Sequence, residues 1–250
     1  MDWYAKHYLK SLELQNEALQ RAFRKELEFL AQHCVGKLKI LEVGSGNGRV
    51  IEGISDRLME LEPKKRPHVF IGVDINQELV DLATKEQVRR SLGYYSDDFI
   101  QDSSRRRPYG AVHFFCMDGR MVGRDFAEER FNVSFTAYNT LGAIEDIGSV
   151  VDAMAYVTRP EGEIINLVWS TEPETTKFLE GYYPALGFKI EELHPEKTIL
   201  RDEAGEAHVI NRPPVRDLVQ AYLAAGIRDF SVSNVGRLYT CIVGKKPERG

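Results

Sequence analysis

The chain has 250 residues with a formal net charge of −5, and 43% of its residues are hydrophobic. This length suits one large α/β domain, or one domain with an insertion, and allows a full buried core. The acidic balance argues against binding to nucleic acid or to an anionic membrane, and no stretch approaches the ~20 apolar residues of a membrane span.

Residues 1–36 are predicted to form a helical cap ahead of the first strand. Apolar side chains recur three, four or seven positions apart, at Leu12, Leu19, Phe23, Leu27 and Leu30. One long helix or two short ones would produce this pattern. Tyr4 and Tyr8, at its beginning, either pack on the core or close over a pocket.

The segment 39–49 predicts a buried strand, a glycine-rich turn and the start of a helix. An apolar run precedes Gly44, Gly46 and Gly48, so every second side chain is missing where the backbone turns. The helix after this turn presents free N–H groups to it. A nucleotide-like ligand is the default expectation.

Strands and helices then alternate along the chain. Further strands are predicted at 68–74, 111–117, 131–138, 163–169, 229–235 and 239–244, with Asn76 capping one of the intervening helices. His113, in the middle of one predicted strand, is expected to be a core histidine. The alternation predicts an α/β fold with a mostly parallel sheet.

Residues 171–213 interrupt the alternation. A helix is predicted over 176–186, and two strand-like runs around the turn at Asp202–Gly205 suggest a hairpin. We therefore predict an insertion over the substrate site, with the core formed by 37–170 and 214–250.

The cysteines Cys34, Cys116 and Cys241 are far apart and lack the spacing of a zinc site or a disulfide framework. Cys116 and Cys241 lie within apolar runs, which predicts buried positions. Because the N-terminus also lacks the apolar core of a signal peptide, we expect a soluble protein in the reducing cytoplasm.

Polar residues gather where the predicted parallel strands end. Asp74, Asp118 and Asn139 join the glycine turn at this edge, which is where ligands of open α/β sheets bind. A carboxylate after the second strand suits the paired hydroxyls of a ribose, and Asp118 suits the exocyclic amine of adenine. Either aspartate alone is also explained as a helix cap or a turn residue.

The glycine turn narrows the choice of nucleotide. Arg49 stands where the dinucleotide fingerprint needs glycine, and no phosphate-loop Gly-Lys-Ser/Thr is present. The remaining pattern, Glu42-x-Gly44-x-Gly46-x-Gly48 with Asp74 after the next strand, resembles the class I S-adenosylmethionine-dependent methyltransferases. The resemblance covers residues 38–170 as motifs.

This resemblance implies a Rossmann-like, doubly wound sheet of seven strands whose last strand is antiparallel. It also implies S-adenosylmethionine as cofactor, without a metal. The cofactor contacts carried over are Glu42, Gly44, Ser45, Gly46, Asp74, Ile75, Asp118, Gly119 and Tyr138.

The residues after the fourth predicted strand indicate the acceptor. Tyr138–Gly142 lacks the Asn/Asp-Pro-Pro-aromatic pattern of the nucleic-acid amino-methylating enzymes and resembles the small-molecule N-methyltransferases. Methyl transfer requires alignment and the exclusion of water. The catalytic candidates are His194 and Asn139, and the substrate candidates are Tyr4, Tyr8, Trp169 and Tyr182.

Several alternatives remain open from the sequence. The acceptor atom is an amine nitrogen or a hydroxyl oxygen, and the acceptor is a small molecule or a protein. A regulatory protein that binds the cofactor without turnover is a third possibility. No nucleic-acid or membrane partner is expected, and the chain is predicted to be a monomer or a homodimer.

Overall fold

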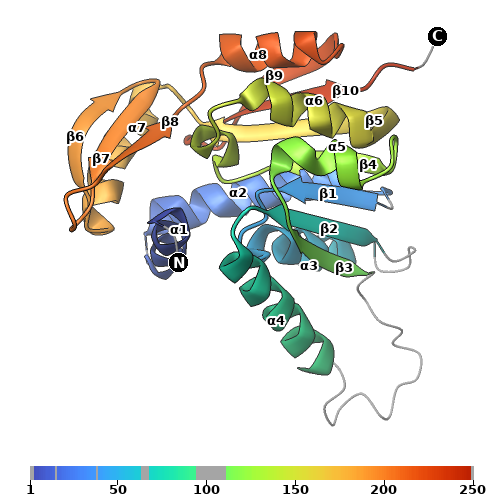
Figure 1. The fold of residues 1–250 in the computed structure, drawn as a ribbon, viewed down its shortest axis with the longest axis horizontal. Coiled ribbons are helices and arrows are strands. Elements are labelled where there is room, and N and C mark those ends of the chain that lie inside the picture. Colours follow the sequence, from blue (N-terminus) through green and yellow to red (C-terminus); the bar gives the residue numbers. More distant parts are fainter. Residues whose placement is uncertain (1–2, 15, 38, 63–67, 94–110, 249–250) are drawn as a thin grey trace.

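The computed structural model describes residues 3–14, 16–37, 39–62, 68–93 and 111–248 (Figure 1). The sequence also suggests a short helix near residues 98–100 and a solvated basic loop at Arg105–Arg107, and both segments lie outside these described residues. The core elements are α1 (Trp3–Glu13), α2 (Glu17–Cys34), β1 (Lys39–Val43), α3 (Arg49–Leu61), β2 (Val69–Asp74), α4 (Gln77–Gly93), β3 (Val112–Cys116), η1 (Gly119–Met121), α5 (Val122–Asp125), β4 (Phe131–Thr136), η2 (Thr140–Ala143), α6 (Ile147–Val157), β5 (Thr158–Trp169), α8 (Val215–Ala224), β9 (Asp229–Val235) and β10 (Tyr239–Lys245).

Seven strands form one sheet in the order β3-β2-β1-β4-β5-β10-β9. The pairs among β1 to β5 are parallel, whereas β10 is antiparallel to both of its neighbours. Figure 1 shows α2, α3 and α4 on one face of the sheet and α5, α6 and α8 on the other. The predicted doubly wound sheet with an antiparallel last strand is confirmed.

β1 lies in the middle of the sheet and is covered on both faces. Ile40 belongs to the apolar cluster under α2 and α3, whereas Leu41 and Val43 belong to the cluster under α6 and α8. All three side chains are buried. Burial on both faces explains why the strand appears as a continuous apolar run and not as an alternating one.

The edge strand β3 corrects two predictions. His113 and Cys116, both expected in the core, are exposed. The hydrophobicity of this segment suggested a buried strand, but among the described strands β3 pairs only with β2 and lies at the end of the sheet. Cys241, on the central strand β10, is buried as predicted.

The insertion contains a helix and a separate sheet. α7 (Pro173–Ala185) precedes the three antiparallel strands β6 (Lys189–His194), β7 (Lys197–Arg201) and β8 (Ala207–Asn211). The predicted hairpin is β7–β8, and it is joined by one strand more than expected. Its turn is closed by a hydrogen bond from Asp202 N to Glu206 O at 3.0 Å.

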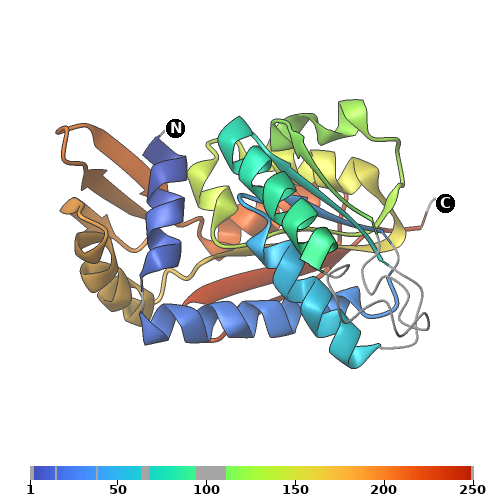
Figure 2. The ribbon, with the colours of Figure 1, turned by 90° about the horizontal axis from the view of Figure 1, so that it is seen from below.

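The N-terminal segment forms two helices. Asn16 starts the second helix by accepting a hydrogen bond from Leu19 N at 3.1 Å, as expected of an N-cap. Figure 2 shows α1 between the insertion and the core. The His7 ring lies 4.7 Å from that of Phe188, just beyond the end of α7. α1 therefore fills the space between the two sheets.

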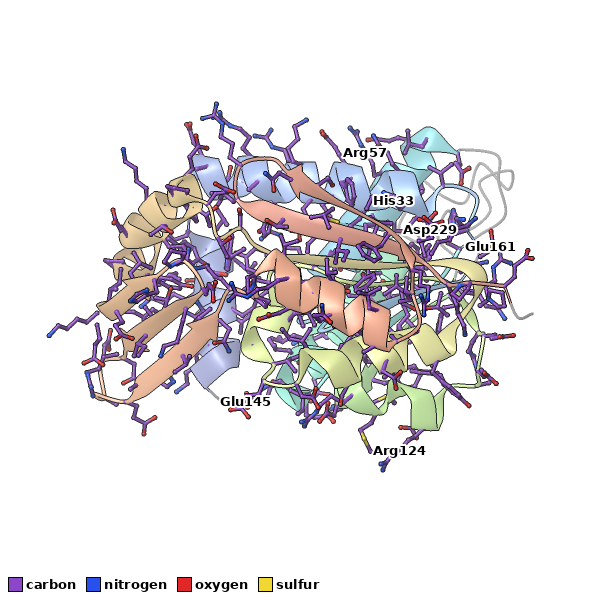
Figure 3. All side chains as sticks on the ribbon, turned by 90° about the horizontal axis from the view of Figure 1, so that it is seen from above. His33, Arg57, Arg124, Glu145, Glu161 and Asp229 are labelled. Atoms are coloured by element: carbon purple, nitrogen blue, oxygen red, sulfur yellow. The ribbon has the colours of Figure 1, made fainter. Side chains whose placement is uncertain are left out.

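The surface mixes both signs of charge, as at Arg57, Arg124 and Glu145 (Figure 3). Across the described ranges, no helix combines the length and apolar character needed to cross a bilayer.

Candidate active site

The glycine turn is held against the end of β2. The N–H groups of Gly44 and Ser45 both donate to Val73 O, at 2.7 and 3.0 Å. Gly44 has a φ of +78°, and a Cβ at this position would lie 2.2 Å from Thr140 Cγ2. Both the left-handed backbone and the close neighbour require glycine here.

Asp74 connects the turn to the next helix. Its Oδ2 accepts a hydrogen bond from Gly46 N at 2.8 Å, and its Oδ1 accepts one from Asn76 N at 2.9 Å. Asn76 in turn caps α4 by accepting from Leu79 N, as predicted. The carboxylate that was expected to hold a ribose therefore also fixes the shape of the loop.

Tyr8 of α1 lies directly on the turn. Its hydroxyl donates to Asn47 Oδ1 at 2.9 Å, and a Cβ at Gly46 would meet its ring at 2.9 Å. Burial, and next the nearby Glu42 carboxyl, raise the pKa of the Tyr8 phenol well above its ordinary value. Tyr8 thus remains a neutral hydroxyl that shields the loop from water.

Two buried carboxyl groups lie beneath the turn. Glu42 ends in an Oε2 with no hydrogen-bond partner among the described residues, and Glu26 of α2 has the same feature. The other oxygen of Glu26 accepts from Tyr138 N at 2.7 Å. Burial raises the pKa of Glu26 to about 7 and that of Glu42 well above its ordinary value. Glu26 was not among the predicted site residues, since it occupies an ordinary core position of a helical pattern.

The chain is strained where it leaves β4. Tyr138 and Asn139 both have positive φ angles, 51° and 60°, a region that bulky side chains seldom adopt. The Asn139 side chain compensates through two hydrogen bonds. Its Oδ1 accepts from Trp169 N at 2.9 Å, and its Nδ2 donates to Asn211 O at 3.3 Å. Asn139 thereby joins β4, β5 and the insertion at one point.

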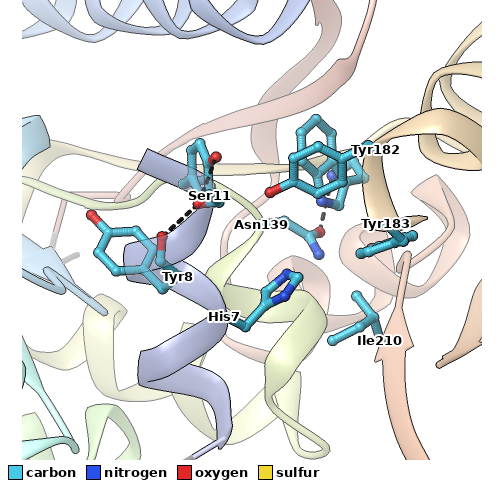
Figure 4. A pocket seen from close by; sticks show the side chains of 9 residues that line it. His7, Tyr8, Ser11, Asn139, Tyr182, Tyr183 and Ile210 are labelled. Atoms are coloured by element: carbon cyan, nitrogen blue, oxygen red, sulfur yellow. Dashed lines mark hydrogen bonds between the residues drawn. The ribbon is translucent and has the colours of Figure 1, made fainter. Parts of the chain in front are cut away.

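A cavity of about 30 Å³ lies beside this strained turn (Figure 4). Its walls are mostly aromatic and are formed by His7, Tyr8, Ser11, Tyr138, Asn139, Trp169, Tyr182, Tyr183 and Ile210. Trp169 is stacked on Tyr239 with ring centroids 4.8 Å apart, which fixes its orientation. The cavity is therefore shaped by the core, by α1 and by the insertion together.

Five of the predicted residues come together at this cavity, namely Tyr8, Tyr138, Asn139, Trp169 and Tyr182. His194 does not join them, because it is exposed at the end of β6. The side chain of Tyr4 lies outside the described residues. The structure thus brings the candidates around the fourth strand together and leaves His194 outside them.

The residues predicted to contact the adenine, Asp118 and Gly119, come just after the edge strand β3. Asp118 accepts from Arg120 N at 2.9 Å and caps η1, and the Arg120 guanidinium lowers the pKa of its carboxyl. Gly119 packs against Val43, and Ile75 is 68% exposed. An apolar side chain exposed next to Asp74 offers a face on which a purine can pack.

Several cavity residues were missed by sequence reasoning. His7 is adjacent to Tyr8 in α1 and faces Tyr183, with ring centroids 6.0 Å apart at 30°. Burial, and then the charges of His208 and Lys10, lower the pKa of His7 to about 4. The imidazole is therefore neutral near pH 7. Only its place beside Tyr8 in the helical pattern could have identified it.

No family model and no curated protein matches this sequence. Solved structures do match. The PH0226 protein from Pyrococcus horikoshii superposes with a TM-score of 0.68 at 14% identity, over 98% of this chain and 99% of that one. A SAM-dependent methyltransferase from Methanosarcina mazei gives a TM-score of 0.59 at 15% identity, over 88% and 98% of the two chains.

A third similar structure is the 1,6-didemethyltoxoflavin-N1-methyltransferase from Burkholderia thailandensis, which holds 1,6-didemethyltoxoflavin and S-adenosylhomocysteine. It superposes with a TM-score of 0.54 at 14% identity, over 91% of this chain and 79% of that one. At these identities the likeness shows the fold. This chain has the Rossmann-like fold of these methyltransferases.

Proposed function

We propose that this protein transfers a methyl group from S-adenosylmethionine to the amine nitrogen of a small molecule. One observation carries the proposal. The glycine turn, Asp74 and an aromatic cavity adjoin at one edge of the sheet, connected by Tyr8, which contacts the turn and lines the cavity. The likeness to solved methyltransferases supports the same function.

The residues present suit this cofactor. Gly44 and Gly46 adopt positive φ angles and let Thr140 and Tyr8 pack closely on the loop, which fixes its shape. The unpartnered Oε2 of Glu42 is an acceptor for an ammonium group, and Asp74 is an acceptor for ribose hydroxyls. Glu42, Gly44 and Gly46 would hold the amino-acid part, Asp74 the ribose, and Ile75 with Asp118 the adenine.

When bound, the cofactor supplies an electrophilic methyl group on a sulfonium. The chain then has to orient the acceptor and exclude water. The rings of Tyr138, Trp169 and Tyr182 surround the cavity, and α1 covers it. Aromatic faces also suit an amine, which becomes cationic on methylation.

We propose nitrogen as the atom that accepts the methyl group because the described residues offer only a weak proton acceptor to the cavity. Within the described part of the chain, no carboxylate lines it, and the candidate base is His7. A histidine with a pKa of about 4 is a weak base. A neutral amine attacks through its lone pair and needs no base beforehand, whereas most hydroxyls do.

Because His7 lines the cavity, O-methylation is the second candidate. The two are separated by replacing His7 with Asn, which retains a polar group of similar reach. If the acceptor is an amine, turnover should change little. If it is a hydroxyl, turnover should fall by about 10²-fold or more, as expected on loss of a general base.

Calorimetry with S-adenosylhomocysteine tests the proposed function directly. Wild-type protein should bind it, and Asp74→Ala should bind it at least tenfold more weakly. Asp152→Ala, an exposed acid on α6, is the control and should bind as the wild type does. Absence of binding by folded wild-type protein would refute the proposal.

A further inference from the structure

Arg212, immediately after β8, is among the largest fully buried side chains of the protein. Its Nη1 donates a hydrogen bond to Thr176 Oγ1 in α7 at 3.0 Å. Its backbone N–H donates to Glu196 O at 2.8 Å. The guanidinium is therefore fixed between α7 and the insertion sheet.

The other edge of this guanidinium has no hydrogen-bond partner among the described residues. Nε and Nη2 are buried and make no hydrogen bond within the described residues. The Glu196 carboxylate does not compensate the charge, since it binds the exposed Arg216 at 2.8 Å. Burial lowers the pKa of Arg212, opposed by the nearby Tyr183 phenol, but a guanidinium stays charged in proteins.

A buried charge without a counter-ion is strongly destabilising and is seldom retained without a function. The two unpartnered groups also have a specific geometry. Nε–H and Nη2–H lie along one edge of the guanidinium plane and point in the same direction. This edge matches the two oxygens of a carboxylate, which accept a pair of parallel hydrogen bonds.

Arg212 adjoins the cavity wall. Its partner Thr176 lies seven residues, or about two turns, before Tyr183, so both occupy the same face of α7. Tyr183 and Ile210 line the cavity (Figure 4). The neighbouring Asn211 accepts the hydrogen bond from Asn139. Arg212 does not itself line the cavity, but it is held by α7 and directly follows β8, and both of these elements supply cavity residues.

We propose that Arg212 binds a carboxylate of the methyl acceptor, so that the acceptor is a small amine that also carries an acidic group. The inference that this carboxylate belongs to the methyl acceptor rests on the proposed function. The anion site itself does not depend on methyl transfer. It can therefore be tested separately.

The first experiment uses acetate as the probe. Thermal unfolding is measured with increasing sodium acetate at constant ionic strength, with chloride as the reference anion. Acetate should raise the wild-type Tm, because a ligand that binds only the folded state stabilises it. Arg212→Met should lose this shift, and Arg216→Met, the exposed control, should keep it.

Two outcomes would overturn the proposal: no acetate shift in the wild type, or an equal shift in Arg212→Met. Without acetate, Arg212→Met should melt no lower than the wild type, since it removes an uncompensated charge. If that variant does not fold, Arg212→Lys serves instead. It retains the charge but not the parallel pair of donors, and its acetate affinity should fall about tenfold.

A parallel titration with inorganic phosphate identifies the type of anion. A carboxylate site predicts a larger shift with acetate than with phosphate at equal concentration. A larger shift with phosphate would overturn the carboxylate assignment.

The second experiment measures formation of S-adenosylhomocysteine with matched amines. The pairs are glycine with methylamine, and 4-(aminomethyl)benzoate with benzylamine. Carboxylated members should be preferred at least tenfold by the wild type, and Arg212→Met should abolish the preference. Preference for the uncharged members would overturn the acceptor class. Failure of the proposed function would appear separately, as loss of S-adenosylhomocysteine binding with the acetate shift intact.

Discussion

The two sides of the candidate site, called its two walls below, are built in different ways. On the core side, polar groups are fixed by backbone hydrogen bonds, as for Asp74 with Gly46 N and Asn139 with Trp169 N. On the side of α1 and the insertion, the contacts are mainly between rings, such as His7 with Tyr183. Arg212 on that side retains two donors without a partner among the described residues.

This difference separates a fixed part of the site from a selective part. Backbone hydrogen bonds hold the core wall in one shape, which suits a ligand that is always the same. Ring contacts are less directional and can repack around different ligands. An unpartnered buried charge, by contrast, rejects ligands that lack the complementary group. The core wall thus suits the cofactor and the insertion wall suits the choice of acceptor.

Gly44→Ala should have the largest effect, because it distorts the fixed wall. The new Cβ would lie 2.2 Å from Thr140 Cγ2 on a backbone with φ of +78°. We expect a loss of about 2–5 kcal/mol in the free energy of unfolding, measured in urea, and weaker binding of S-adenosylhomocysteine. Gly205→Ala is the matched control, with φ of +83° and no atom within 4 Å. It should cost only about 1 kcal/mol.

A pH titration of stability should give the next largest effect. Burial raises the pKa of Glu26 from 4.5 to about 7, so the folded state keeps a proton that the unfolded chain releases. The free energy of unfolding should therefore fall as pH rises from about 4.5 to about 7, by up to about 3 kcal/mol from this group. Glu26→Gln should flatten the profile in this window.

Glu28→Gln on the same helix is the control for that titration. Its side chain is 38% exposed and pairs with Lys25, so the profile should stay close to that of the wild type. An unchanged slope in Glu26→Gln would show that the carboxyl beneath the fixed wall ionises normally.

Tyr8→Phe tests the contact between the two walls with a smaller change. The ring on Gly46 is retained, while the hydrogen bond to Asn47 Oδ1 is lost. We expect a loss of about 1 kcal/mol in the free energy of unfolding. Tyr156→Phe, at an exposed tyrosine, should cost less. Equal values for the two variants would mean that the Tyr8 hydroxyl does not anchor α1.

His194→Ala should have the smallest effect. The side chain is exposed on β6 and is not part of either wall. Stability should change by less than about 0.5 kcal/mol, and binding of S-adenosylhomocysteine should be unchanged. A large loss of turnover in this variant would show that His194 takes part in the reaction. It would then contradict the assignment of the site to these two walls.

The sequence alone predicted the strands of the main sheet and the residue types of the glycine turn. The apolar run of β1, the glycines after it and the acid after β2 are local patterns, because strand burial and positive φ angles restrict the residue types at each position. Parallel strands bring their carboxyl ends to one edge, so the strand pattern was enough to predict that Asp74 and Asn139 lie at the same edge as the turn.

The insertion wall was decided by the tertiary structure. His7, Tyr183 and Arg212 come from three separate elements, and no periodicity connects α1 with α7 and the end of β8. For the same reason His194 appeared to be the better base, and the edge position of β3 was not foreseen. Whether a buried charge has a partner depends on contacts between elements distant in sequence, and in Arg212 only those contacts revealed a guanidinium with one edge unpaired.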